Sequence, residues 1–221
     1  MSVDPAAWSE RRKRRVAILI FEDVEVLDFA GPFEVFGVAR QADGEPAFEV
    51  EVFSLDAGVI HARNGLRVLP HHRAEDPRMD LLIVPGGYGV RRLLADDRTH
   101  RFLIAGYEVS ETTLSVCTGS LLLGACGLLG GLAATTHSDA IDELRAVDAA
   151  IDVRPDARMV DNGKVVTSAG ISAGIDASLY LVARFCGHDV AAETARYMNY
   201  DWRHRVADGV HIVRNRPEWP A

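Results

Sequence analysis

A cysteine in the middle of the chain stands between an apolar segment and a glycine. Cys117 follows the apolar run Thr113–Val116 and precedes Thr118 and Gly119. This order is typical of a nucleophile elbow, a tight strand-to-helix turn that presents one side chain above the edge of a sheet. Because a helix N-terminus favours an anion, we expect the pKa of the Cys117 thiol to be lowered. The spacing alone leaves two interpretations open, a reactive thiol and a buried structural cysteine.

A glycine-rich turn follows a second apolar segment, Leu81–Val84, and reads Pro85-Gly86-Gly87-Tyr88-Gly89. Ligands of open α/β sheets bind beyond the carboxyl ends of the strands, so this turn is expected to lie beside Cys117. We expect the amides of Gly87 and Thr118 to form an oxyanion site. The turn has neither the lysine of a P-loop nor the spacing of a dinucleotide fingerprint, and we expect no cofactor.

The other cysteines and the histidines indicate no further chemistry. Cys126 and Cys186 lie inside apolar helical segments and are expected to be core residues. Seven histidines other than His137 are scattered, without the spacing of metal ligands, so we expect no metal site.

The elements that must position these residues alternate between strand and helix. The segments expected to be strands are 15–21, 48–53, 81–84, 113–116, 157–160 and 164–168, with a hairpin over 60–69 that turns at Asn64-Gly65. The expected helices begin near Gly31-Pro32, span 98–109 and 119–129, and fill most of 172–200. This alternation predicts one doubly wound α/β domain with a parallel sheet. We expect a polar tail at 1–14, the domain at 15–202 and a second tail at 203–221.

Composition excludes several classes of protein. Of the 221 residues, 48% are hydrophobic and 25% charged, which rules out a disordered chain. A formal net charge of −8 argues against nucleic acid as a partner. The longest apolar stretch, 121–134, is shorter than the roughly 20 residues that span a bilayer, and the N-terminus has no apolar signal region. With three cysteines and no disulfide pattern, we expect a cytoplasmic protein with no membrane partner.

Several short motifs resemble the ThiJ/PfpI superfamily, which is class I glutamine amidotransferase-like. The Cys-Thr-Gly order at Cys117 resembles its isonitrile (isocyanide) hydratase branch, and equally the amidotransferase-like sensor half of AraC-type regulators. The motifs that carry the resemblance are Asp28-Phe-Ala-Gly-Pro32, Val84-Pro-Gly-Gly87, Ser115-Val-Cys-Thr-Gly-Ser120, Ala134-Thr-Thr-His137 and Ser168-Ala-Gly-Ile-Ser-Ala-Gly-Ile-Asp176.

The resemblance implies a flavodoxin-like three-layer α/β sandwich with a mostly parallel sheet, found as a homodimer. It implies that Cys117 is the reactive cysteine and that Asp28 is its partner acid. Without the resemblance, Asp28 is interpreted as a helix N-cap before Pro32. Glu25 is the second acid within reach. His137 matches a histidine that approaches the cysteine and is a second-tier candidate.

Three functions follow as hypotheses. The first is hydration of an isocyanide by Cys117, with Asp28 relaying protons, Thr118 orienting water, and Gly86, Gly87 and Tyr88 lining the site of a small electrophilic substrate. The second is a sensor module related to AraC-type regulators; the chain past His188 is too short for their helix-turn-helix units, so we expect no DNA binding in cis. The third is a glyoxalase- or deglycase-like reaction on carbonyls. Thr118 stands where the peptidase-like branch has histidine, which disfavours proteolysis.

Overall fold

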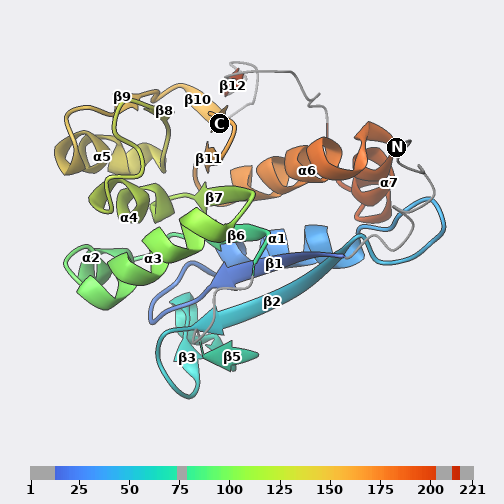
Figure 1. The fold of residues 1–221 in the computed structure, drawn as a ribbon, viewed down its shortest axis with the longest axis horizontal. Helices are drawn as coiled ribbons and strands as arrows, with labels where there is room; N and C mark the ends of the chain where they lie inside the picture. The colour runs from blue at the N-terminus through green and yellow to red at the C-terminus, as the bar shows by residue number, and fades with distance from the viewer. Residues whose placement is uncertain (1–12, 74–78, 203–210, 215–221) are drawn as a thin grey trace, which may run out of the picture.

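The fold is built on one eight-stranded sheet. The computed structural model describes residues 13–73, 79–202 and 211–214. Its strands lie in the order β12-β10-β11-β7-β6-β1-β2-β5 (Figure 1). The bounds are β1 Arg14–Leu19, β2 Phe48–Ser54, β5 His72–Arg73, β6 Leu81–Val84, β7 Thr112–Val116, β10 Ala157–Asp161, β11 Val165–Ser168 and β12 His211–Arg214.

The six strands from β11 to β5 run parallel, whereas β10 and β12 pair antiparallel at one edge. Every residue of β6, β7 and β11 is buried, as expected for parallel strands that are covered on both faces. The predicted fold class, a mostly parallel flavodoxin-like sheet, is therefore confirmed. Strand β12 lies within the segment 203–221 that we expected to be a tail.

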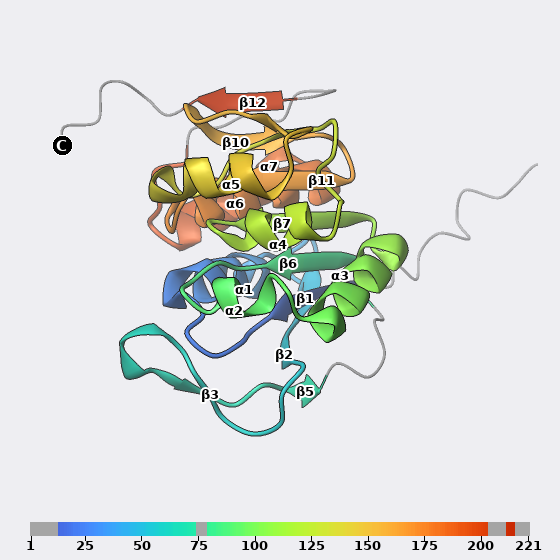
Figure 2. The same cartoon turned by 90° about the vertical axis from the view of Figure 1, so that its left-hand side faces the viewer.

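Helices cover both faces of this sheet, as Figure 2 shows. Three of them, α1, α6 and α7, pack together on one face, and the remaining four lie on the other. The bounds are α1 Val26–Val38, α2 Val90–Leu93, α3 Asp97–Val109, α4 Gly119–Ala125, α5 Ile141–Val147, α6 Ala173–Cys186 and α7 His188–Tyr197. No helix in the described part of the chain is both long and apolar enough to cross a membrane.

Short elements complete the chain. Strands β3 (Ile60–His61) and β4 (Arg67–Val68) form the predicted hairpin, in which Asn64 adopts a φ of 60°. Strands β8 (Ala133–Ala134) and β9 (Asp152–Val153) form a second small sheet.

The first helix begins earlier than predicted. Glu25 caps α1 by accepting a hydrogen bond from the Val26 amide at 3.3 Å, so Asp28 lies in the first turn and is not the N-cap. Pro32 lies inside the helix, where its ring nitrogen cannot donate to the Asp28 carbonyl one turn earlier. The preference of proline for a first turn made it a misleading marker of the helix start, because packing of α1 against α6 retains helical geometry through Pro32.

Two other helix predictions were too long. The segment 172–200 divides into α6 and α7 at Gly187, whose φ of 95° is incompatible with a continuous helix. The helix after Cys117 ends at Ala125 instead of 129, before Gly127 with a φ of 73°. Helix α5 was not predicted at all.

Gly119 begins α4 against the end of a neighbouring strand. A Cβ atom on Gly119 would lie 2.0 Å from the Val84 carbonyl oxygen and 2.9 Å from that of Pro85. Both are backbone atoms that cannot rotate away. The close approach of α4 to β6, and with it the turn at Cys117, therefore depends on the absence of a side chain at this position.

We predict that Gly119→Ala lowers the free energy of unfolding by about 3 kcal/mol or more, because backbone must move to admit the methyl group. Gly37→Ala is the matched control. Gly37 lies in α1, and apart from its chain neighbours and the nearby backbone of that helix no described heavy atom lies within 4 Å of its would-be Cβ, so alanine should raise the free energy of unfolding by up to about 1 kcal/mol. Urea denaturation measures both; equal effects of the two substitutions would contradict the close-approach argument.

Candidate active site

The carboxyl ends of four adjacent strands, β11, β7, β6 and β1, meet at one edge of the sheet. The segments that leave these strands carry Ile171, Cys117, Gly86 and Asp28 respectively. Strand order reverses between β1 and β6, since β2 follows β1 on one side while β6 lies on the other. Ligand sites of open α/β sheets form at such a switch point. The predicted site residues Cys117 and Asp28 are therefore brought together from segments far apart in sequence.

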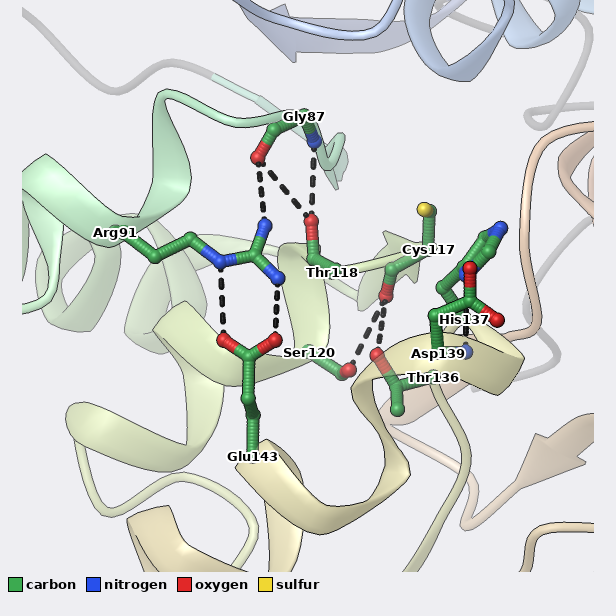
Figure 3. A network of polar contacts seen from close by, with 9 residues as sticks. All are labelled: Gly87, Arg91, Cys117, Thr118, Ser120, Thr136, His137, Asp139 and Glu143. Atoms are coloured by element: carbon green, nitrogen blue, oxygen red, sulfur yellow. Dashed lines mark hydrogen bonds and ion pairs between the residues drawn. The ribbon is translucent and has the colours of Figure 1, made fainter.

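Cys117 is held at a sharp turn between β7 and α4. Its φ of 57° lies in the left-handed region that residues other than glycine rarely adopt. Its amide donates to the carbonyls of Ser168 and Ala169, both at 3.1 Å. Its carbonyl accepts from the hydroxyls of Ser120 at 3.2 Å and Thr136 at 3.0 Å, and the side chain points the other way (Figure 3). The backbone is thus fixed on both sides of the thiol, as at a nucleophile elbow.

Asp28 is a fully buried carboxyl beside this thiol. Its Oδ2 accepts a hydrogen bond from the Gly86 amide at 3.0 Å. Its Oδ1 is buried and has no hydrogen-bond partner of standard geometry among the described residues. Burial raises the pKa of Asp28 from 3.8 to about 7, against the opposing effects of hydrogen bonding to the Gly86 amide and the Cys117 thiol. Asp28 is therefore a carboxyl that holds or releases a proton near neutral pH.

The thiol responds to the same burial. Desolvation, followed by the charge of Asp28, raises the pKa of Cys117 to about 12, although the amides of Thr118 and Ile171 oppose the rise. The expectation of a lowered thiol pKa is therefore wrong. Burial and the neighbouring Asp28 carboxylate raise the pKa of Cys117 by more than the two amide donors lower it. The pair releases one proton near pH 7 and retains the other into alkaline solution. Near neutral pH the site therefore exchanges one proton, and its negative charge lies on the Asp28 carboxylate while the Cys117 thiol keeps its proton.

The Gly86-Gly87 turn offers the reactive pair one backbone amide, that of Gly86, and not the amide of Gly87 that we expected. The Gly87 amide donates to the Thr118 hydroxyl oxygen at 3.0 Å and is not free to bind an oxyanion, which corrects that expectation. Gly86 instead donates to Asp28. A Cβ on Gly86 would lie 2.5 Å from the Thr118 nitrogen, so the turn closes directly over the residue that follows the cysteine.

Ile171 provides the amide that the sequence analysis missed. Its backbone N–H interacts with both Asp28 and Cys117 and lowers the pKa of each. Its φ of 50° is exceptional for a β-branched side chain. Backbone strain of this kind is retained where the surrounding structure enforces it, and here it aims an amide at the reactive pair.

His137 lies next to the site without bonding to the thiol. Its Nδ1 accepts the Asp139 amide at 3.2 Å, and its ring packs on Gly170, where a Cβ would lie 2.2 Å from the ring carbon Cδ2. Within the described residues it makes no hydrogen bond to Cys117. Because Nδ1 is an acceptor, the neutral ring carries its proton on Nε2 and is a donor there.

Tyr88 and Glu25 play different parts from those of Cys117 and Asp28. The Tyr88 side chain is 63% exposed, and the Arg63 guanidinium lies 3.8 Å from the centre of its ring. Glu25 caps α1 and raises the pKa of Asp28 through its charge. The Glu25 carboxylate also lies 3.9 Å from the Arg63 guanidinium. Glu25 therefore influences the site through its charge and makes no described hydrogen bond to Asp28.

The remaining cysteines lie away from the elbow. Cys126 caps the end of α4 and Cys186 ends α6. Neither forms a disulfide among the described residues, and both are half-buried against the core instead of fully inside it. Across the described ranges, no group of three or more histidine, cysteine or acidic residues is arranged to hold a metal ion.

Comparison with known proteins agrees with this geometry. The model of the DJ-1/PfpI family matches residues 14–184. The chain is 36% identical to isonitrile hydratase of Pseudomonas putida over 84% of this chain and 78% of that protein. It is 25% identical to the HTH-type transcriptional regulator GbdR of Pseudomonas aeruginosa over 86% of this chain, and spans only about half of the regulator, 52%. A solved ThiJ/PfpI family protein of Pseudomonas syringae superposes with a TM-score of 0.76 at 25% identity, covering 93% of this chain and 84% of that one.

We predict that Asp28 makes the stability of the protein fall as the pH rises from about 4 to about 7. A carboxyl whose pKa is raised on folding binds its proton more tightly in the folded state, so stability is full below the unfolded pKa and is lost as Asp28 ionises. The loss amounts to as much as about 4 kcal/mol. Urea unfolding of the parent and of Asp28→Asn at several pH values measures it; a difference between the two proteins that stays constant across this range would refute the prediction.

Proposed function

The chain belongs to the DJ-1/PfpI family, and we propose that it is a cysteine-dependent enzyme that hydrates an isocyanide to an N-substituted formamide. The observation that carries the proposal is the buried Cys117–Asp28 pair with one proton to exchange near neutral pH. A reaction that begins by adding a thiol and ends by expelling it needs such a pair. The 36% identity to an isonitrile hydratase supports this choice of substrate.

The first step joins the thiol to the substrate. The sulfur of Cys117 forms a bond to the terminal carbon of R–N≡C, and a proton from the shared pair is delivered to that same carbon. The product is a thioimidate, Cys117–S–CH=N–R, which leaves Asp28 ionised. The amides of Thr118 and Ile171 stabilise the negative charge that develops on sulfur as the thiol loses its proton during the attack.

The second step releases the product. The Asp28 carboxylate removes a proton from water as the water oxygen bonds to the thioimidate carbon, and it passes that proton to the imine nitrogen. The tetrahedral species, Cys117–S–CH(OH)–NH–R, then expels the Cys117 sulfur and forms the formamide carbonyl as its hydroxyl proton passes to Asp28. That proton restores the starting pair, so atoms balance as R–NC plus water to R–NH–CHO. A carboxyl with a pKa near 7 suits both directions of transfer.

The match to transcriptional regulators favours a second candidate, a small-molecule sensor. The aligned region is about half of each regulator, 52% in both GbdR and CdhR of Pseudomonas aeruginosa. In that case a ligand would bind over Cys117 without turnover. Binding of a metabolite together with no reaction on p-nitrophenyl isocyanide or methylglyoxal would favour the sensor.

We predict that the protein hydrates p-nitrophenyl isocyanide faster than it consumes methylglyoxal, as judged by following formamide and carbonyl concentrations. Cys117→Ala should abolish hydration because the covalent step is lost. Asp28→Asn should reduce kcat by roughly 10²–10⁴-fold, because an amide cannot relay a proton.

Cys126→Ala is the matched control. Cys126 is a half-buried thiol that no described contact links to Cys117, so its loss should leave kcat unchanged. Parent-like hydration by the Cys117→Ala variant would end the proposed mechanism, and preference for methylglyoxal would favour a glyoxalase-like activity.

A further inference from the structure

The charged side chain of Arg91 contacts the Gly86-Gly87 turn, although it belongs to neither member of the Cys117–Asp28 pair. Arg91, in the short helix α2, binds Glu143 of α5 through two hydrogen bonds, Nε to Oε2 at 3.0 Å and Nη2 to Oε1 at 2.6 Å. Its third nitrogen, Nη1, donates to the Gly87 carbonyl at 3.3 Å (Figure 3). A guanidinium held by a bidentate carboxylate has a fixed direction, so Nη1 stays aimed at this carbonyl.

Three donors compete for the Gly87 carbonyl oxygen. They are Arg91 Nη1 at 3.3 Å, the Val90 amide at 3.3 Å and the Thr118 hydroxyl at 3.4 Å. A carbonyl oxygen has two lone pairs, and a charged donor forms the stronger hydrogen bond. With Arg91 and Val90 in place, the hydroxyl makes the weakest of the three contacts, because it is uncharged and lies furthest from the oxygen.

The Thr118 hydroxyl is fixed but retains its proton. Its oxygen accepts the Gly87 amide at 3.0 Å, which holds the side chain beside the turn. A hydroxyl that accepts one hydrogen bond still has one proton to donate. The destination of that proton depends on whether the Gly87 carbonyl is already occupied.

We propose that Arg91, held by Glu143, is a positioning residue for Thr118. By competing for the Gly87 carbonyl, Arg91 weakens the contact of the Thr118 hydroxyl with that oxygen, so that the hydroxyl proton is released to the reacting molecule bound at Cys117. Without Arg91 the hydroxyl bonds more firmly to Gly87. The inference rests on the proposed function in one respect, the reaction whose rate is measured. In isocyanide hydration, the Thr118 hydroxyl donates a hydrogen bond to the imine nitrogen while water adds.

The test is a double-mutant cycle of Arg91→Met and Thr118→Val on the full chain, with kcat for p-nitrophenyl isocyanide as the readout. Arg91→Met alone should lower kcat on the order of tenfold, the loss of one hydrogen bond in the transition state. In the Thr118→Val background, Arg91→Met should have no further effect, because the hydroxyl it positions is already absent. A merely structural role for Arg91 would lower kcat or stability equally in both backgrounds, and that result would overturn the proposal, as would an unchanged kcat in Arg91→Met.

A second readout does not depend on isocyanide turnover. In the addition of Cys117 to acrylamide, sulfur bonds to the terminal carbon, charge develops on the carbonyl oxygen and the adjacent carbon finally takes the proton. A hydroxyl donor stabilises that oxygen, so the same non-additive pattern should appear in the rate of Cys117 modification, followed by mass spectrometry of its peptide. If the parent hydrates no isocyanide, the proposed function fails, while the acrylamide cycle still decides for or against the role of Arg91.

The chain offers matched controls for both members of the ion pair. Arg98 also binds one carboxylate, Asp56 at 2.6 Å, and one carbonyl, that of Leu55 at 3.2 Å, but it does not touch the glycine turn. Asp142 precedes Glu143 in α5 and pairs with Arg145 at 2.8 Å. Arg98→Met and Asp142→Asn should leave both rates at the parent value, whereas Glu143→Gln should lower them in the Thr118 background only. Equal losses in the controls would overturn the assignment.

Discussion

The burial of a carboxyl against a thiol is the constraint on which the site depends. Asp28 and Cys117 are both removed from water, so each pKa rises and neither group ionises independently of the other. The surrounding backbone limits the penalty by donating amides: Gly86 to the carboxyl, Thr118 to the sulfur, and Ile171 to both. Close approach of these amides explains the glycine turn and the two left-handed residues, Cys117 and Ile171.

The parallel sheet makes this convergence possible. Four neighbouring strands end at one edge, and each contributes one segment to the site, so residues separated by more than a hundred positions in the chain meet there. Strands β6, β7 and β11 are buried along their whole length, although β7 and β11 include serine and threonine, and this burial holds their ends in register. Packing of this buried sheet therefore offsets the free-energy cost of burying Asp28 and of holding the strained turns.

Sequence patterns predicted what depends on periodicity and composition. The buried strands, the hairpin at Asn64 and the elbow at Cys117 all follow from local apolar runs and turn residues. Asp28 was found only through its resemblance to a family, because a carboxyl before proline is also an ordinary helix cap. The Ile171 amide could not be predicted, since no side-chain pattern marks a β-branched residue with a φ of 50°. The occupied Gly87 amide was missed because hydrogen-bond partners across loops leave no trace in spacing.

An ion pair on the outer helices, Arg91 with Glu143, contacts the backbone of the glycine turn beside the buried site. The thiol and carboxyl are almost completely enclosed, so their hydrogen bonds leave little freedom for adjustment within the site itself. The Gly87 carbonyl faces outward to Arg91, whereas its amide faces Thr118. Gly87 therefore connects a half-exposed ion pair between α2 and α5 to the residue beside the nucleophile. Its amide and its carbonyl belong to two successive planar peptide units, and the φ of 128° at Gly87, in a region that favours glycine, sets the angle between them.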